Sequence, residues 1–210
     1  GFHVWINGSW LVMETATVTA GLIALRFVRF PFLTMPIAFA VWYMSMDLVP
    51  LIMKREEFSL DERKLVSIFV GLAMLVISYI ADRRTKQDFS FWGYLFGMIA
   101  FWGGLSLMDS GSELNKFFYC MLNVLLMLLS IWLSRKVFLV FGALGVFGYL
   151  GYLSYHVFED SMLFPFALSF LGILLISCAV LYQRNEKKIE AFFERVVPGP
   201  VKKFRPVSRT

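Results

Sequence analysis

Long apolar runs recur along this chain, and they constrain its fold more than any other feature. The run from Pro31 to Met53 contains a single charged residue, Asp47. A helix needs about 20 apolar residues to cross the roughly 30 Å of hydrocarbon in a bilayer. A window of about 19 residues finds seven such runs: Ser9–Leu25, Pro31–Met53, Leu65–Ala81, Ser90–Met108, Phe117–Leu133, Val137–Phe158 and Ser161–Tyr182. The sequence therefore predicts an all-α transmembrane bundle of about seven spans.

Composition supports a membrane protein over a soluble one. Hydrophobic residues make up 59% of the chain, whereas soluble domains contain about 45–50%. A bilayer accommodates this excess because surface that faces lipid is apolar as well. The runs do not alternate between apolar and polar residues, which excludes membrane strands. The first run is the weakest of the seven, since it is short and contains Glu14 and three threonines.

Basic residues are distributed unevenly between the two sets of connections. One set, together with the carboxyl-terminal tail, holds 15 of the 20 lysines and arginines. Cytoplasmic loops carry the excess of Lys and Arg, so we expect the amino terminus outside and the carboxyl terminus inside. The net charge of +5 then reflects topology, and no nucleic acid partner is expected. The expected location is the inner (cytoplasmic) membrane of a cell.

The chain is expected to divide into a transmembrane domain, residues 1–183, and a cytoplasmic segment, residues 184–210. In the second part Ile189, Phe192 and Val196 share one helical face, which indicates an amphipathic helix on the membrane surface. The alternative is a disordered end. Basic residues of this segment are expected to bind anionic lipid: Lys187, Lys188, Lys202, Lys203 and Arg205.

Glycines in two of the runs indicate close helix packing. Gly93 and Gly97 form a small-xxx-small pair in the fourth run, and four more glycines mark the sixth. Small residues let membrane helices approach closely, so we expect the fourth and sixth helices to lie inside the bundle. The glycines of the sixth run are Gly142, Gly145, Gly148 and Gly151.

Glu14 and Asp47 are the only acids that the predicted spans contain. A carboxylate within hydrocarbon costs about 2.5–3.5 kcal/mol on insertion scales, so it should face other helices or water. We hypothesise that Glu14, Asp47 and His156 line an outward-facing cavity that accepts a proton or a cation, with Asn123 at a similar depth. The alternative is that each acid reaches the surface or binds a neighbouring helix for assembly.

Other chemistry is sparse. The two histidines and two cysteines form no zinc-like cluster, and neither a phosphate-binding loop nor a nucleophile motif is present. We therefore expect no catalytic residue, no metal site and no cofactor.

Three apolar segments carry a resemblance to known proteins: FWGYLFGMIAFWGGLSLMD (Phe91–Asp109), FGALGVFGYLGYL (Phe141–Leu153) and FPFALSFLGI (Phe164–Ile173). They resemble bacterial multi-spanning inner-membrane proteins of unknown function, over the second half of the chain. The resemblance implies a bacterial inner-membrane protein and no particular chemistry.

The sequence favours a non-catalytic structural or accessory membrane subunit. It would lie in the lipid bilayer and would pack with a second copy of itself or with other membrane subunits. A small transporter or channel with a site at Asp47 and Glu14 is the alternative, and a membrane-embedded enzyme ranks third.

Overall fold

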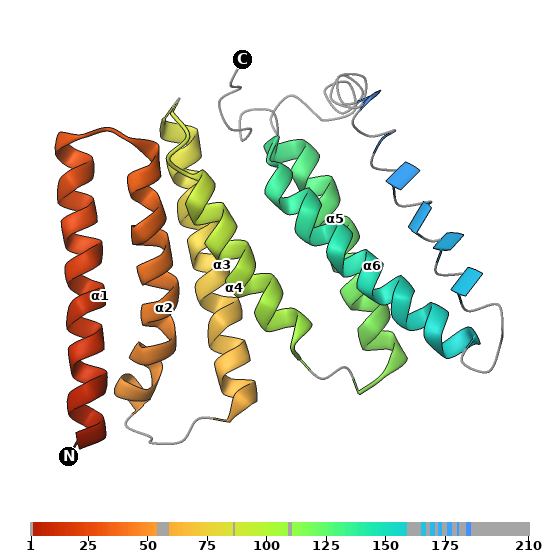
Figure 1. Ribbon diagram of the computed structural model, residues 1–210, viewed down its shortest axis with the longest axis horizontal. Coiled ribbons are helices and arrows are strands. Elements are labelled where there is room, and N and C mark those ends of the chain that lie inside the picture. Colours follow the sequence, from red (N-terminus) through yellow and green to blue (C-terminus); the bar gives the residue numbers. More distant parts are fainter. Residues whose placement is uncertain are drawn as a thin grey trace. The chain divides into compact units, whose positions relative to one another are not determined.

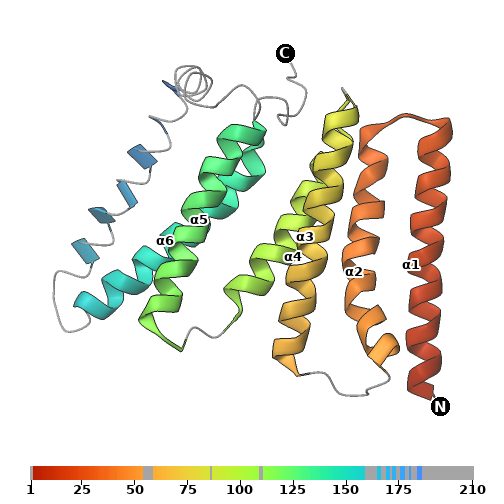
Figure 2. The same cartoon turned by 180° about the vertical axis from the view of Figure 1, so that it is seen from behind.

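The computed structural model describes residues 2–53, 59–85, 87–108 and 111–158, with separate residues between 165 and 185 (Figures 1 and 2). Within these residues the chain is all-helical, which confirms the predicted class. The α-helices are α1 (Phe2–Phe27), α2 (Thr34–Met53), α3 (Leu60–Arg84), α4 (Phe91–Ser106), α5 (Glu113–Leu133) and α6 (Lys136–Phe158), and a short 3₁₀ helix, η1 (Pro31–Leu33), precedes α2. The seventh predicted run and the predicted surface helix fall outside the continuous ranges that the structure describes.

Four of the described helices are long and apolar enough to cross a membrane, as in an integral membrane protein. Their spans are Trp10–Phe27, Leu60–Arg84, Glu113–Leu133 and Lys136–His156. The first of them contains most of the weakest predicted run. The segment Pro31–Met46 is a shorter apolar stretch.

Side chains at the helix ends explain where several helices begin and end. Ser59 precedes α3, and its hydroxyl accepts a hydrogen bond from the Glu62 amide while the Glu62 carboxylate accepts one from the Ser59 amide. This reciprocal pair satisfies two amides that a helix start leaves without partners. At the end of α5, Ser134 adopts a left-handed conformation (φ 53°), which turns the chain directly into α6.

The chain divides into two compact units, one with α1–α4 and the other with α5 and α6. In the first unit α1 packs on α2, α2 packs on both α3 and α4, and α3 packs along α4. The connections α1–α2 and α3–α4 lie at the same end of this unit (Figure 1). The hydrophobic core includes Ala38, Met74 and Phe96, with Trp42 and Trp92 packed against them. In the second unit α5 and α6 form a helical hairpin.

The third helix is longer than its sequence prediction. The predicted span ends at Ala81, whereas α3 continues to Arg84. Asp82 is therefore part of the helix and is almost fully buried, with 2% of its surface exposed. The sequence prediction assigned Asp82 to a connecting loop, whereas the structure places it in α3.

Candidate functional site

Helices α3 and α4 approach each other through small residues on both sides. A Cβ atom added at Gly71 would lie 2.8 Å from the carbonyl oxygen of Gly97 and would collide with the backbone of Phe101. A Cβ at Gly104 would lie 2.8 Å from the carbonyl oxygen of Lys64. Such contacts allow no side chain larger than hydrogen without a shift of backbone. The two helices therefore pack backbone against backbone.

Hydroxyl groups run along the same interface. The Ser67 hydroxyl donates to the carbonyl oxygen of Ala100 at 2.8 Å, which links α3 directly to α4. The Ser78 hydroxyl donates to Met74 of its own helix at 2.7 Å and occupies the space that a side chain at Gly93 would need. Both serines thus satisfy their hydroxyl groups within the helical pair, as buried polar groups require.

Asp82 closes this interface at one end. Its carboxylate accepts a hydrogen bond from the Ser90 hydroxyl at 2.9 Å and one from the Tyr94 hydroxyl at 3.4 Å. Ser90 and Tyr94 are themselves almost fully buried, with 2% and 1% exposed. The spacing of Ser90 and Tyr94, four residues apart on one face of a helix, was a sequence signal for such a contact. Hydropathy does not predict this contact, because a hydropathy value depends on residue type and not on which residues touch.

The glycines of α6 fall into two groups. Gly142 and Gly145 face α5, where a Cβ at Gly142 would lie 2.6 Å from the Asn123 carbonyl oxygen and one at Gly145 would overlap the Asn123 side-chain amide. No atom of the described residues lies within 4 Å of a Cβ added at Gly148 or Gly151. Asn123 is fully buried, and its amide nitrogen donates to the Tyr119 carbonyl oxygen at 2.8 Å.

Glu14 and Asp47, the two acids of the cation hypothesis, belong to adjacent helices of the first unit. A Cβ at Gly21 would contact the Ile37 side chain, so these two positions face each other in the antiparallel pair α1 and α2. Glu14 lies seven residues before Gly21, and position 44 lies seven residues after Ile37, so the two are level in this antiparallel pair. Asp47 is three residues further along α2, which is about 4.5 Å along the helix axis. The Glu14 side chain is buried, with 6% exposed.

Asn123 and His156, the other two residues of that hypothesis, belong to the second unit. His156 is exposed and stacks on Tyr152, with 4.1 Å between ring centroids. The Tyr152 hydroxyl donates to Glu113 at 2.8 Å. His156 lies eleven residues beyond Gly145, which Asn123 contacts, so about 16 Å of helix separates the two sites. The structure therefore does not bring Asn123 and His156 together.

The described residues of the first unit line cavities that include the following two. One, of about 400 Å³, is lined by α2, α3 and α4. The other, of about 610 Å³, is lined by residues that include Arg29 and Arg84. Glu14 lines neither of them. Within the described residues, no three His, Cys, Asp or Glu side chains group as a metal site would require.

Comparisons of the chain with protein-family models, with curated proteins and with solved structures found no match.

Proposed function

We propose that this chain is a non-catalytic integral membrane subunit that assembles with further membrane helices, either of a second copy or of another protein. The use of small and polar residues along α3 and α4 is the observation that supports this proposal. Gly71, Ser67 and Asp82 all serve contact between the two helices. Residues of this kind hold membrane helices together, because lipid supplies no hydrophobic drive for association.

Large apolar side chains on the outer faces are consistent with further assembly in a bilayer. Val12 and Ile23 of α1 are 67% and 60% exposed, and Phe69 and Ile77 of α3 are 70% and 65% exposed. Such faces require lipid or other apolar helices around them. The covering helices would come from the partner subunit, and lipid would cover the remaining surface.

The purified full-length chain provides the test of assembly. We expect its protein mass in a mild detergent, measured by light scattering with the detergent contribution subtracted, to exceed that of one 24.2 kDa chain. The excess would correspond to a second copy or to a stoichiometric membrane partner identified by mass spectrometry. A single chain without a partner, at several protein concentrations and in two detergents, would contradict the proposal.

The proposed topology has about seven spans, with the amino terminus outside and the carboxyl terminus in the cytoplasm of a bacterial inner membrane. Residues 1–183 would form the membrane domain, and the basic segment 184–210 would lie on the inner surface. Arg29 and Arg84 line one cavity, so two of the basic connections share one end of the first unit. The positive-inside rule assigns such an end to the cytoplasm.

Single-cysteine labelling tests this orientation. In a variant whose native Cys120 and Cys178 are replaced by serine, a cysteine at Ser59 should react with an impermeant maleimide in intact cells. A cysteine at Thr85 should react only after the membrane is permeabilised. The reverse pattern would contradict the proposed orientation.

A small transporter or channel is the second candidate, and the burial of Glu14 favours it. An acid that is 6% exposed and level with the region of Asp47 on the next helix could take up a proton or a cation from the outer side. Proton flux into liposomes is the measurement. Glu14→Gln and Asp47→Asn should each abolish a flux that Asp61→Asn, a change at an exposed surface acid, leaves intact. Equal flux in all four proteins would exclude this role.

A further inference from the structure

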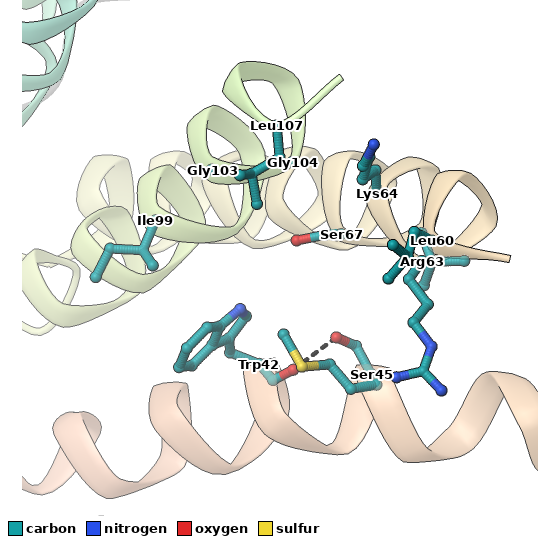
Figure 3. A pocket seen from close by; sticks show the side chains of 12 residues that line it. Trp42, Ser45, Leu60, Arg63, Lys64, Ser67, Ile99, Gly103, Gly104 and Leu107 are labelled. Atoms are coloured by element: carbon teal, nitrogen blue, oxygen red, sulfur yellow. Dashed lines mark hydrogen bonds between the residues drawn. The ribbon is translucent and has the colours of Figure 1, made fainter. Parts of the chain in front are cut away.

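The 400 Å³ cavity of the first unit has a mostly apolar lining (Figure 3). Its walls include Trp42 and Met46 of α2, Val66 of α3, Ile99 of α4, and Leu107, which directly follows α4. Its volume lies in the range of about 300–1,000 Å³ that is typical of pockets for small ligands. The polar groups Ser45 and Ser67 donate their hydroxyl hydrogens to backbone carbonyls of Trp42 and Ala100. The walls are therefore suited to hydrocarbon.

The end of this cavity at the start of α3 is basic. Arg63 and Lys64 both line it, and the Arg63 side chain reaches from α3 toward α2 (Figure 3). Two acids of the same turn have other partners, since Asp61 binds Lys64 at 2.9 Å and Glu62 caps the helix through Ser59. The exposed guanidinium of Arg63 thus sits at the mouth of an apolar cavity.

The positions of charge and hydrocarbon match one kind of ligand. From Leu60 to Ser67 the cavity follows α3 for about 10 Å, with its cations at the helix end and its apolar walls toward the helix centre. We propose that this cavity binds one anionic phospholipid of the surrounding bilayer. Its phosphate would lie at Arg63 and Lys64, and an acyl chain would lie along Trp42 and Ile99. Guanidinium and ammonium groups form charge-assisted hydrogen bonds with the oxygens of a phosphate.

Gly103 offers a direct way to fill the cavity. It lines the cavity wall, and within the described part of the chain no atom lies within 4 Å of a Cβ added there. A phenylalanine at this position would enter the space of the acyl chain without collision at its Cβ. Gly148 of α6 has the same open surroundings and lies in the other unit, so Gly148→Phe is the matched control.

The test counts lipid bound to the full-length chain by native mass spectrometry. The delipidated protein in nonionic detergent would be titrated with phosphatidylglycerol or with phosphatidylcholine. We expect one phosphatidylglycerol to bind in preference to phosphatidylcholine. Arg63→Gln should weaken that binding about fivefold, as expected for one cation near an anionic headgroup. Arg83→Gln, at the other end of α3, should leave it unchanged.

Filling the cavity should have a different effect from removing the charge. Gly103→Phe should abolish the tightly bound lipid, whereas Gly148→Phe should retain it. Binding of both lipids with equal affinity, or an equal loss in Arg63→Gln and Arg83→Gln, would overturn the proposal. If Gly103→Phe does not fold, Trp42→Ala should alter acyl-chain-length selectivity, and unchanged selectivity would overturn the proposal as well.

Discussion

The two helical pairs α3–α4 and α5–α6 use glycine in different ways. In the first pair Gly71 and Gly104 meet backbone of the partner helix, as Gly71 does against Gly97 and Phe101. In the second pair the glycines lie on one helix alone. There Gly142 meets the Asn123 carbonyl oxygen and the Met127 side chain, whereas Gly145 forms a notch that the Asn123 side-chain amide occupies.

Glycine spacing therefore predicts that a neighbouring helix comes close, but it does not predict whether backbone or side-chain atoms of that helix make the contact. Backbone contact leaves no atom that can rotate away, so it should tolerate no added side chain. A notch filled by a side chain can adjust, because the filling residue can change its conformation or be replaced together with the glycine. Gly71 and Gly145 should therefore differ both in their sensitivity to a larger side chain and in their capacity for rescue.

The largest expected effect is at Gly71. In Gly71→Leu the new side chain must push α4 away, because backbone atoms of Gly97 and Phe101 occupy its space. We expect a loss of about 3 kcal/mol in the free energy of unfolding, the upper part of the range for overpacked sites. Denaturation in mixed micelles measures it. Gly148→Leu is the control, since no atom of the described residues lies within 4 Å of a Cβ added there, and a similar loss there would contradict the backbone-contact interpretation.

A second effect concerns the polar end of the α3–α4 interface. Asp82→Ala removes the acceptor that Ser90 and Tyr94 share, and loss of a buried acceptor costs about 1–3 kcal/mol. Asp82→Asn keeps one oxygen as an acceptor, so its unfolding free energy should fall less. Equal stability of the Ala variant and the original protein would show that these hydrogen bonds do not stabilise the pair.

The α5–α6 pair should allow rescue, which sharpens the comparison. Gly145→Ala alone should destabilise, because the added methyl group overlaps the Asn123 amide. In the Asn123→Ala background the same change should cost little, since the notch is then empty. A double-mutant cycle on unfolding free energies should give a coupling of about 1 kcal/mol. Additive losses of unfolding free energy would show that Gly145, like Gly71, cannot be rescued by a change in the residue it contacts.

The smallest expected effect is a gain. Gly148 lies in the middle of α6 with open space around it, and alanine is favoured over glycine within a helix by about 0.5–1 kcal/mol. Gly148→Ala should therefore raise the melting temperature slightly. A clear decrease would show that a further helix packs against this glycine in the complete protein.

Much of the helical architecture could be predicted from the sequence. Six of the apolar runs correspond in order to the α-helices of the described residues, although α1, α3 and α5 begin several residues before their runs. The proximity of Gly93 and Gly97 to the partner helix also followed from their spacing. Gly71 could not be identified as the partner of Gly97, because that contact depends on how two helices align in space.

The candidate sites were less accessible to sequence analysis. Glu14 is buried, in keeping with an acid among apolar residues, but His156 is exposed and far along α6 from the position that Asn123 contacts. The cavity beside Arg63 was not foreseen at all. It arises where side chains from three helices leave space unfilled. The sequence of any one of these helices does not predict such a space.

The order of residues is enough to predict which segments are helical and apolar, since each segment satisfies its own backbone hydrogen bonds and its hydropathy is a sum over its own residues. Tertiary structure alone decided that Asp82 is buried against Ser90 and Tyr94 and that Gly103 faces a cavity. The physical reason is that burial depends on the rotation and register of one helix against another, which the order of residues in either helix does not specify.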